Sequence, residues 1–212
     1  MFVNEKALVE KLVNDLQEKY GTQYIVKELR SGNNIADIVC ATDLERTNIV
    51  FDEYYNAYFY FNSIYKHKKI CLDEFMLSNE KANRKFYHFL KELEELGYIK
   101  IDNNYITTIK KVDAVTKNII AIEAKLADWR AGLEQAVRYK QYANEVYVAL
   151  SSENVHKVDR QQFINLNIGL MSVSDGKLKI VIRAKRQQVE KLDVQFYMAD
   201  RFLRQLKFSE LV

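Results

Sequence analysis

The chain has 212 residues, 48% hydrophobic and 29% charged, which is typical of a soluble globular protein with one ordinary domain and a small second one. Its formal net charge of +3 excludes neither a nucleic acid nor a protein partner, and its two cysteines are too few for a disulfide framework or a zinc site. Because no apolar run approaches the roughly 18 residues of a membrane span and the N-terminus lacks a signal-peptide pattern, we expect a cytoplasmic protein that does not enter a membrane.

The first part of the chain has the pattern of a helix followed by two strands. Leucines recur at helical spacing through residues 5–20, and Gly21 is placed to end that helix. Two predicted strands follow at residues 24–29 and 35–42, joined by a turn. A short apolar run at residues 49–52 is a candidate extension of the same sheet.

The pattern then changes to three helices and a hairpin. An aromatic-rich helix is predicted at residues 53–65, a short one at 72–77, and a third at 80–96 with a single apolar stripe. Residues 98–107 form two short runs around an Asp-Asn-Asn turn, which is typical of a hairpin. This order is the plan of a winged helix, a variant of the helix-turn-helix, and it predicts a small inserted domain at residues 53–110.

The rest of the chain predicts a mixed or parallel sheet. Residues 118–126 and 145–151 have the pattern of buried strands, and the helix predicted at 128–142 would cross over between them. We therefore predict an α/β fold whose core is discontinuous, built from residues 1–52 and 111–212 as a mixed sheet flanked by helices. The last predicted elements are two strands and a helix, at residues 168–173, 178–182 and 187–206.

Two of the predicted strands carry charged residues in apolar surroundings. Asp37 interrupts one strand, and Glu123 and Lys125 lie two apart in another, so these two project from the same face. A buried acid costs on the order of several kcal/mol unless it is paired or holds a metal. Two acids beside a lysine would hold a hard divalent cation, with the lysine stabilising charge on a phosphate. The alternative is a salt bridge among the three residues without catalysis.

These residues resemble the motif of the PD-(D/E)xK nuclease superfamily, with Asp37 in one strand and Glu123-Ala124-Lys125 in the next core strand. Ala36 stands where the motif name has proline. By this resemblance, Asp37 and Glu123 would ligate Mg²⁺ or Mn²⁺, the backbone carbonyl of Ala124 would be a further ligand, and Lys125 would assist the attacking water.

The resemblance extends to the following helix and to the order of elements. Gln135 and Tyr139 match the Gln-x-x-x-Tyr element of many superfamily branches, and their spacing puts both on one helix face. They would position the substrate backbone or support the carboxylates, or simply hydrogen-bond to the sheet. With the insert removed, the chain also follows the superfamily order of helix, three strands, helix and strand, which implies a restriction-endonuclease-like core.

A further acid completes the site in this superfamily. Glu28, in the strand before Asp37, is one candidate, although it is equally compatible with a surface strand position. Many branches take this acid from the first helix instead, where the candidates are Glu5, Glu10 and Glu18.

Several residues are candidates for contacting DNA. The third helix of the predicted winged helix would dock in a groove through its first turns, with Lys100 of the hairpin on a phosphate. Trp129 and Arg130 follow the motif directly and are further candidates, although Trp129 could equally pack in the core. The helix candidates are Lys81, Arg84 and Lys85. A separate basic run is interpreted as solvated surface: Lys66, His67, Lys68 and Lys69.

Together these features predict a Mg²⁺-dependent nuclease that hydrolyses DNA phosphodiester bonds in restriction, repair, recombination or mobile-element biology. One alternative is a non-catalytic DNA-binding regulator that keeps the nuclease fold as a scaffold. Another is a subunit that is idle until its partner docks, since winged helices often mediate protein contacts and a homodimer is also compatible. RNA as the substrate stays open at this point.

Overall fold

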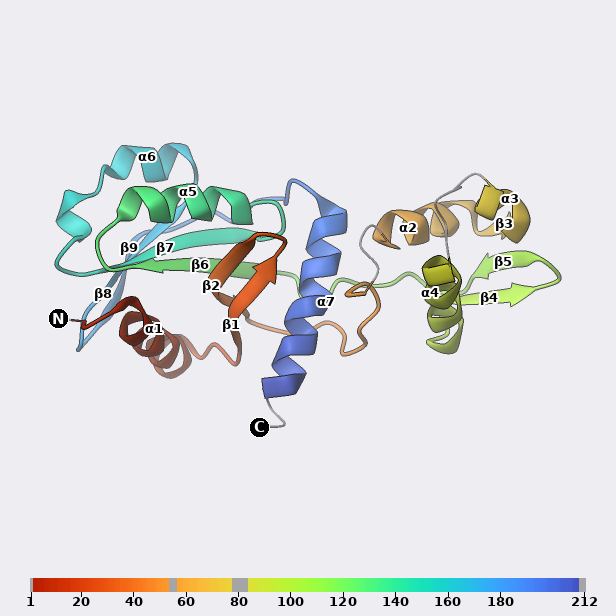
Figure 1. The fold of residues 1–212 in the computed structure, drawn as a ribbon, viewed down its shortest axis with the longest axis horizontal. Coiled ribbons are helices and arrows are strands. Elements are labelled where there is room, and N and C mark those ends of the chain that lie inside the picture. The colour runs from red at the N-terminus through yellow and green to blue at the C-terminus, as the bar shows by residue number, and fades with distance from the viewer. Residues whose placement is uncertain (1, 54–56, 78–83, 210–212) are drawn as a thin grey trace.

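Two sheets organise the chain, as Figure 1 shows for a computed structural model that describes residues 2–53, 57–77 and 84–209. A six-stranded sheet lies at one end of the long axis and a three-stranded sheet at the other. Within the described ranges, no helix combines the length and the apolar character needed to cross a membrane.

The larger sheet has the strand order β1-β2-β6-β7-β8-β9. The neighbours β6, β7 and β8 run parallel, whereas β1, β2 and β9 join through antiparallel pairs. A helix connects each parallel pair, as parallel strands require. The prediction of a mixed α/β sheet is therefore confirmed. The strands are β1 (Tyr24–Ser31), β2 (Asn34–Ala41), β6 (Ile119–Lys125), β7 (Glu145–Ser151), β8 (Gly169–Val173) and β9 (Leu178–Ile182).

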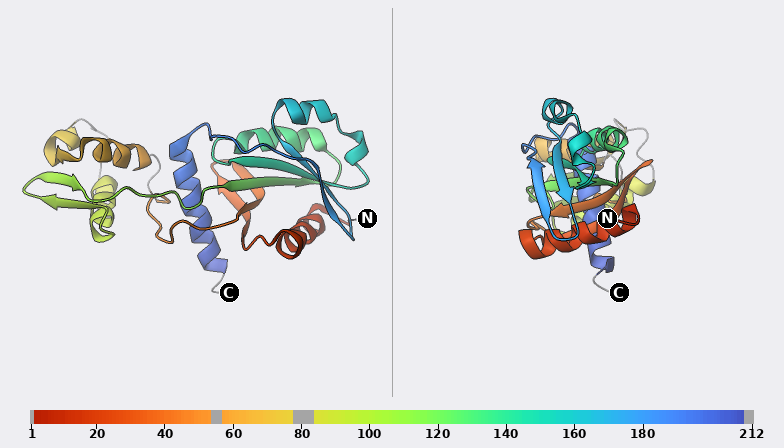
Figure 2. Two further views of the ribbon diagram at one scale, coloured as in Figure 1. Left: turned by 180° about the vertical axis from the view of Figure 1, so that it is seen from behind. Right: turned by 90° about the vertical axis from the view of Figure 1, so that its left-hand side faces the viewer.

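Helices cover both faces of this sheet (Figure 2). On one face lies α1 (Glu5–Tyr20), whose Leu8 and Leu12 are fully buried against apolar side chains of β2 and β6 such as Ile38. The helix ends at Gly21, which has the left-handed φ of 63° that favours glycine. The other face is covered by α5 (Trp129–Tyr139), α6 (Arg160–Asn165) and α7 (Leu192–Ser209).

The smaller sheet belongs to a segment inserted between β2 and β6, which are neighbours in the larger sheet. It is antiparallel with the order β3-β5-β4, and its helices pack an aromatic core that includes Phe61 and Phe89. Asn103 and Asn104 form the hairpin turn with positive φ, as the sequence predicted. The elements are α2 (Ala57–His67), β3 (Lys69–Cys71), α3 (Leu72–Leu77), α4 (Arg84–Glu95), β4 (Ile99–Asp102) and β5 (Tyr105–Thr108).

A buried ion pair ties the connections between the two sheets to α7. Asp200 of α7 is fully buried and pairs with the Arg46 guanidinium, whose Nε also donates to the Asp113 carbonyl at 2.6 Å. Two backbone N–H groups of residues 49–52 donate to the same Asp200 carboxylate. The predicted sheet extension at residues 49–52 is therefore wrong, because these N–H groups are satisfied by a side chain instead of a strand.

The last helix also differs from its prediction. It begins at Leu192 and not at residue 187. Residues 187–191 lie alongside the loop that follows α5. The Gln187 N–H donates to the Asn144 carbonyl, and the Lys191 N–H donates to the Gln141 carbonyl. Tertiary hydrogen bonds therefore replace the first helical turn that the sequence pattern favours.

Candidate functional site

Two neighbouring strands bring the predicted acids together. The antiparallel pairing of Ile38 with Ile122 places Asp37 of β2 next in line with Glu123 of β6. Asp37 is half-buried, and its Oδ2 accepts a hydrogen bond from the Ala124 N–H at 2.7 Å. Burial raises the pKa of Asp37 above its ordinary value, and the hydrogen bond from Ala124 opposes that shift. The first predicted acid is thus fixed against the strand that carries the second.

Glu123 is the most deeply buried charged member of the group, with 1% of its surface exposed. Burial raises its pKa, and hydrogen bonds from Lys125 and Tyr139 counteract this, while the nearby Asp37 carboxylate raises it further. A carboxylate in this position is poorly solvated and needs positive charge or hydrogen-bond donors around it.

Lys125 supplies that positive charge. Its Nζ lies 2.8 Å from Glu123 Oε1 and 3.8 Å from Oε2 of Glu5, which begins α1. Burial alone would lower the pKa of the ammonium, but Glu123, Glu5 and Asp37 together raise it. Lys125 therefore stays protonated at neutral pH, and can donate hydrogen bonds but not accept a proton.

Tyr139 of α5 holds the other oxygen of the same carboxylate. Its hydroxyl lies 2.6 Å from Glu123 Oε2 and 2.7 Å from the Ile35 carbonyl oxygen. Burial raises the pKa of Tyr139, and the bonded carboxylate raises it further, so the phenol remains a donor. Gln135, one turn earlier, is partly exposed, and no hydrogen bond of its side chain is found among the described residues. Tyr139 thus supports the carboxylate, and Gln135 is free to contact a ligand.

A glycine that the sequence analysis did not single out allows this close packing. A Cβ at Gly132 of α5 would lie 3.0 Å from Val148 Cγ1 and 3.2 Å from Lys125 Cγ. Its missing side chain therefore lets the helix approach the strand that carries Lys125.

A cavity of 660 Å³ lies beside Asp37, between α1 and β1, and most of the candidates for a further acid line it. Glu28 lines it with a left-handed backbone, φ 56°, at the point where the pairing of β1 with β2 skips one position opposite Asp37. Glu5 and Glu10 of α1 also line the cavity, whereas Glu18 is not among its described lining residues. Three of the four predicted candidates thus face the same space.

The chemistry of these side chains fits a hard divalent cation, since all its ligands would be oxygen atoms and a buried carboxylate lacks solvation. In their present positions, however, no three acidic, histidine or cysteine side chains of the described residues are grouped as they would be around a metal ion. Glu123 is occupied by Lys125 and Tyr139 instead. Metal binding would require the Glu123 side chain to exchange part of these contacts for the cation.

The candidate DNA contacts fall in different environments. Trp129 is 6% exposed and packs near Phe163, so it takes the core position that the sequence left open, while exposed Arg130 covers its ring at 4.5 Å. Lys100 is 66% exposed and lies 3.8 Å from Asp102. The remaining candidates lie outside what the structure describes: the residue Lys81 and the side chains of Arg84 and Lys85.

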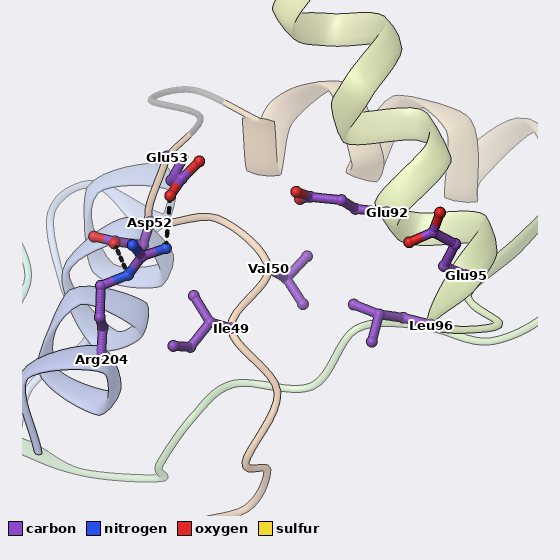
Figure 3. Close-up of a pocket in the computed structure, with 8 residues that line it drawn as sticks. All are labelled: Ile49, Val50, Asp52, Glu53, Glu92, Glu95, Leu96 and Arg204. Atoms are coloured by element: carbon purple, nitrogen blue, oxygen red, sulfur yellow. Dashed lines mark hydrogen bonds and ion pairs between the residues drawn. The ribbon is translucent and has the colours of Figure 1, made fainter. Parts of the chain in front are cut away.

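A second pocket, of 280 Å³, lies where the insert meets α7 (Figure 3). Arg204 of α7 pairs there with Asp52 at 2.5 Å and with Glu53 at 2.9 Å. Glu92 and Glu95 of α4 line the pocket from the other side. With four carboxylates and one guanidinium among its described lining residues, this junction is unsuited to phosphate.

Comparisons with known proteins add little to this geometry. No protein-family profile matches the chain, and no curated protein does. A solved structure of a protein of unknown function from Silicibacter pomeroyi is similar over 44% of this chain and 60% of that protein, with 16% identity and a TM-score of 0.32. The chain thus spans less than two thirds of that protein's length, and function has to be argued from the residues.

Proposed function

We propose that the chain is a Mg²⁺-dependent nuclease of the PD-(D/E)xK type that hydrolyses DNA phosphodiester bonds. The observation that carries this proposal is the meeting of Asp37 and Glu123 on neighbouring strands, with Lys125 and Tyr139 bonded to Glu123. Distant parts of the sequence thus supply two acids, an ammonium group and a phenol to one place, which supports the resemblance to this superfamily.

The order of elements supports a nuclease-like core and an inserted winged helix. α1, β1, β2, β6, α5 and β7 follow the order expected of a restriction-endonuclease-like core. In the insert, a helix, a strand, two helices and a hairpin form a sheet of order β3-β5-β4, which we interpret as a winged helix. The insert would then be a DNA-binding module attached to the catalytic core.

Asp37 and Glu123 would hold Mg²⁺ or Mn²⁺, with the Ala124 carbonyl and an acid from the neighbouring cavity as further ligands. A bound cation supplies Lewis-acid charge that polarises the scissile phosphate. Lys125, which stays protonated, would donate to a non-bridging phosphate oxygen and stabilise the charge that develops there. Tyr139 would keep Glu123 oriented, and Gln135 would contact the substrate backbone.

Cleavage of plasmid and linear duplex DNA with Mg²⁺, Mn²⁺ or EDTA tests the proposal. Asp37→Asn, Glu123→Gln and Lys125→Ala should each lower the metal-dependent rate by about 100-fold or more, as removal of a group that stabilises the transition state does. Lys177→Ala is the matched control, because Asp175-Gly176-Lys177 has the same short pattern in the turn before β9. A Glu123→Gln protein that cuts at the wild-type rate would overturn the assignment.

One observation favours a second candidate, a DNA-binding regulator without catalysis. Both oxygens of Glu123 already have protein partners, as in a purely structural ion pair. Such a protein would bind duplex DNA in EDTA and leave it intact with Mn²⁺ under all conditions, whereas the nuclease would cut.

A further inference from the structure

We propose that the insert binds the phosphate backbone of double-stranded DNA through a lysine groove on the outer face of its three-stranded sheet, and not through the C-terminal half of α4. This groove, of 510 Å³, lies between the end of α2 and strands β3 and β5. Its lining residues are Tyr65, Lys66, Lys68, Lys69, Thr107, Thr108 and Ile109. DNA binding by this groove rests on the proposed function only in its choice of DNA as the ligand, and it does not require that the core cleaves.

The strand register builds the basic face. Lys69 of β3 and Lys100 of β4 both pair with Thr107 of β5, so the three side chains form one row across the sheet. Both lysines are exposed. The next row, which includes fully buried Ile106, faces the aromatic core. The basic run that the sequence suggested to be ordinary solvated surface is therefore one edge of a continuous surface.

The positive charge of this surface is not compensated. Three lysines that line the groove, and two that follow its lining residue Ile109 in sequence, have no carboxylate of the described residues within 4.0 Å. Such crowding of like charges disfavours the folded chain unless an anion is present. They are Lys66, Lys68, Lys69, Lys110 and Lys111. Lys100 is the exception at the rim, where Asp102 lies 3.8 Å away.

The backbone conformation of Lys68 also supports a binding role for this lysine. Its φ of 57° lies in the left-handed region, where glycine would be favoured at the end of a helix. The Thr108 N–H donates to the Lys68 carbonyl at 2.9 Å and fixes this turn beside β5. A lysine in a glycine-type position is strained, and a role for its side chain accounts for that strain.

The rings in this region favour a duplex over single strands. Tyr105 and Tyr65 are partly exposed, but the ammonium of Lys69 lies 4.4 Å from the Tyr105 ring and that of Lys111 lies 5.9 Å from the Tyr65 ring. Unpaired bases would have to displace these lysines to stack. A duplex needs only ammonium and hydroxyl donors to its phosphates, which the groove supplies.

The side of the insert that faces α7 is electrostatically unsuitable for binding DNA. Glu92 and Glu95 of α4 face the acidic junction, opposite Asp52 and Glu53, as Figure 3 shows. A phosphate backbone would be repelled there and attracted to the sheet face. DNA bound by the insert would therefore contact the lysine groove.

The test is fluorescence anisotropy of a labelled 24-base-pair duplex with the full chain in EDTA, which prevents metal-dependent cleavage. In the groove variant Lys66→Gln/Lys68→Gly/Lys69→Gln, affinity near 0.1 M salt should fall at least about tenfold and the slope of log K against log salt by about 3. The matched control Lys177→Gln/Lys179→Gln/Lys191→Gln removes the same charge from exposed lysines of the core and should retain wild-type affinity.

Lys68→Gly alone separates binding from folding. It relieves the left-handed strain, so it should melt at or above the wild-type temperature and still bind the duplex more weakly. Unchanged affinity in the groove variant, an equal loss in the control, or tighter binding of a single strand of the same length would each overturn the inference. Absence of cleavage with Mn²⁺ refutes only the nuclease proposal, whereas cleavage with unaltered binding by the groove variant refutes only this one.

Discussion

Tyr139→Phe is the most informative single substitution, because it removes only one hydroxyl, which contacts the buried Glu123 carboxylate and the Ile35 carbonyl oxygen. The hydroxyl lies 2.6 Å from Glu123 Oε2, and Glu123 is 1% exposed, so solvent does not readily replace the lost donor. A hydrogen bond to a charged group contributes about 1.5–3 kcal/mol. For a chain of this size, a loss of about 2 kcal/mol lowers the melting temperature by roughly 4–8 °C.

The loss should depend on pH in a defined direction. Burial holds the pKa of Glu123 above its ordinary value, and the Tyr139 hydroxyl pulls it back down by stabilising the ionised form. The destabilisation by Tyr139→Phe is therefore largest well above the folded-state pKa of Glu123. It shrinks as pH falls through that value, because the protonated carboxyl needs the donor less.

Tyr142→Phe is the control. Tyr142 is also buried, but its hydroxyl has no hydrogen-bond partner among the described residues. Removing an unpartnered buried hydroxyl should leave the melting temperature equal or raise it. Thermal unfolding in EDTA across pH 5–9 measures both variants. The reasoning is refuted if Tyr139→Phe melts with the wild type at pH 8, or if Tyr142→Phe is the more damaging of the two.

Two further substitutions test other contacts. Asp37→Asn should unfold at a higher temperature than the wild type at pH 8 in EDTA, because the pKa of Asp37 is raised in the folded chain and its ionisation therefore opposes folding. The gain in melting temperature should vanish as pH falls through that pKa. An unchanged or lower melting temperature at pH 8 would contradict this expectation. Asp200→Ala leaves Arg46 and two backbone N–H groups without their buried partner, so we expect the free energy of unfolding in urea to fall by about 3–5 kcal/mol. A loss under about 1 kcal/mol would show that the Arg46–Asp200 ion pair contributes little to stability.

The sequence predicted the parts of the site that follow from local periodicity. Side chains alternate along a strand, so the spacing of Glu123 and Lys125 placed both on one face, where the structure has them 2.8 Å apart. Helical spacing likewise put Gln135 and Tyr139 on one side of α5. Both inferences needed only the geometry of a single element.

What the sequence did not predict depends on contacts between distant segments. The approach of Glu5 to Lys125 depends on how α1 packs against β6. The buried ion pair of Arg46 with Asp200 joins residues that are 154 positions apart. β3 was missed because it has only three residues, it follows a lysine-rich run, and only one of its side chains, Ile70, faces the core. Patterns within one element do not encode such pairings.

The central claim is that Asp37 and Glu123 share one divalent cation. Titration of the full chain with Mn²⁺, followed by the electron paramagnetic resonance signal of the free ion, tests it directly. We predict one bound Mn²⁺ per wild-type chain, with binding lost in both Asp37→Asn and Glu123→Gln and retained in Lys177→Ala. Equal Mn²⁺ binding by the wild type and both acid variants would contradict the claim.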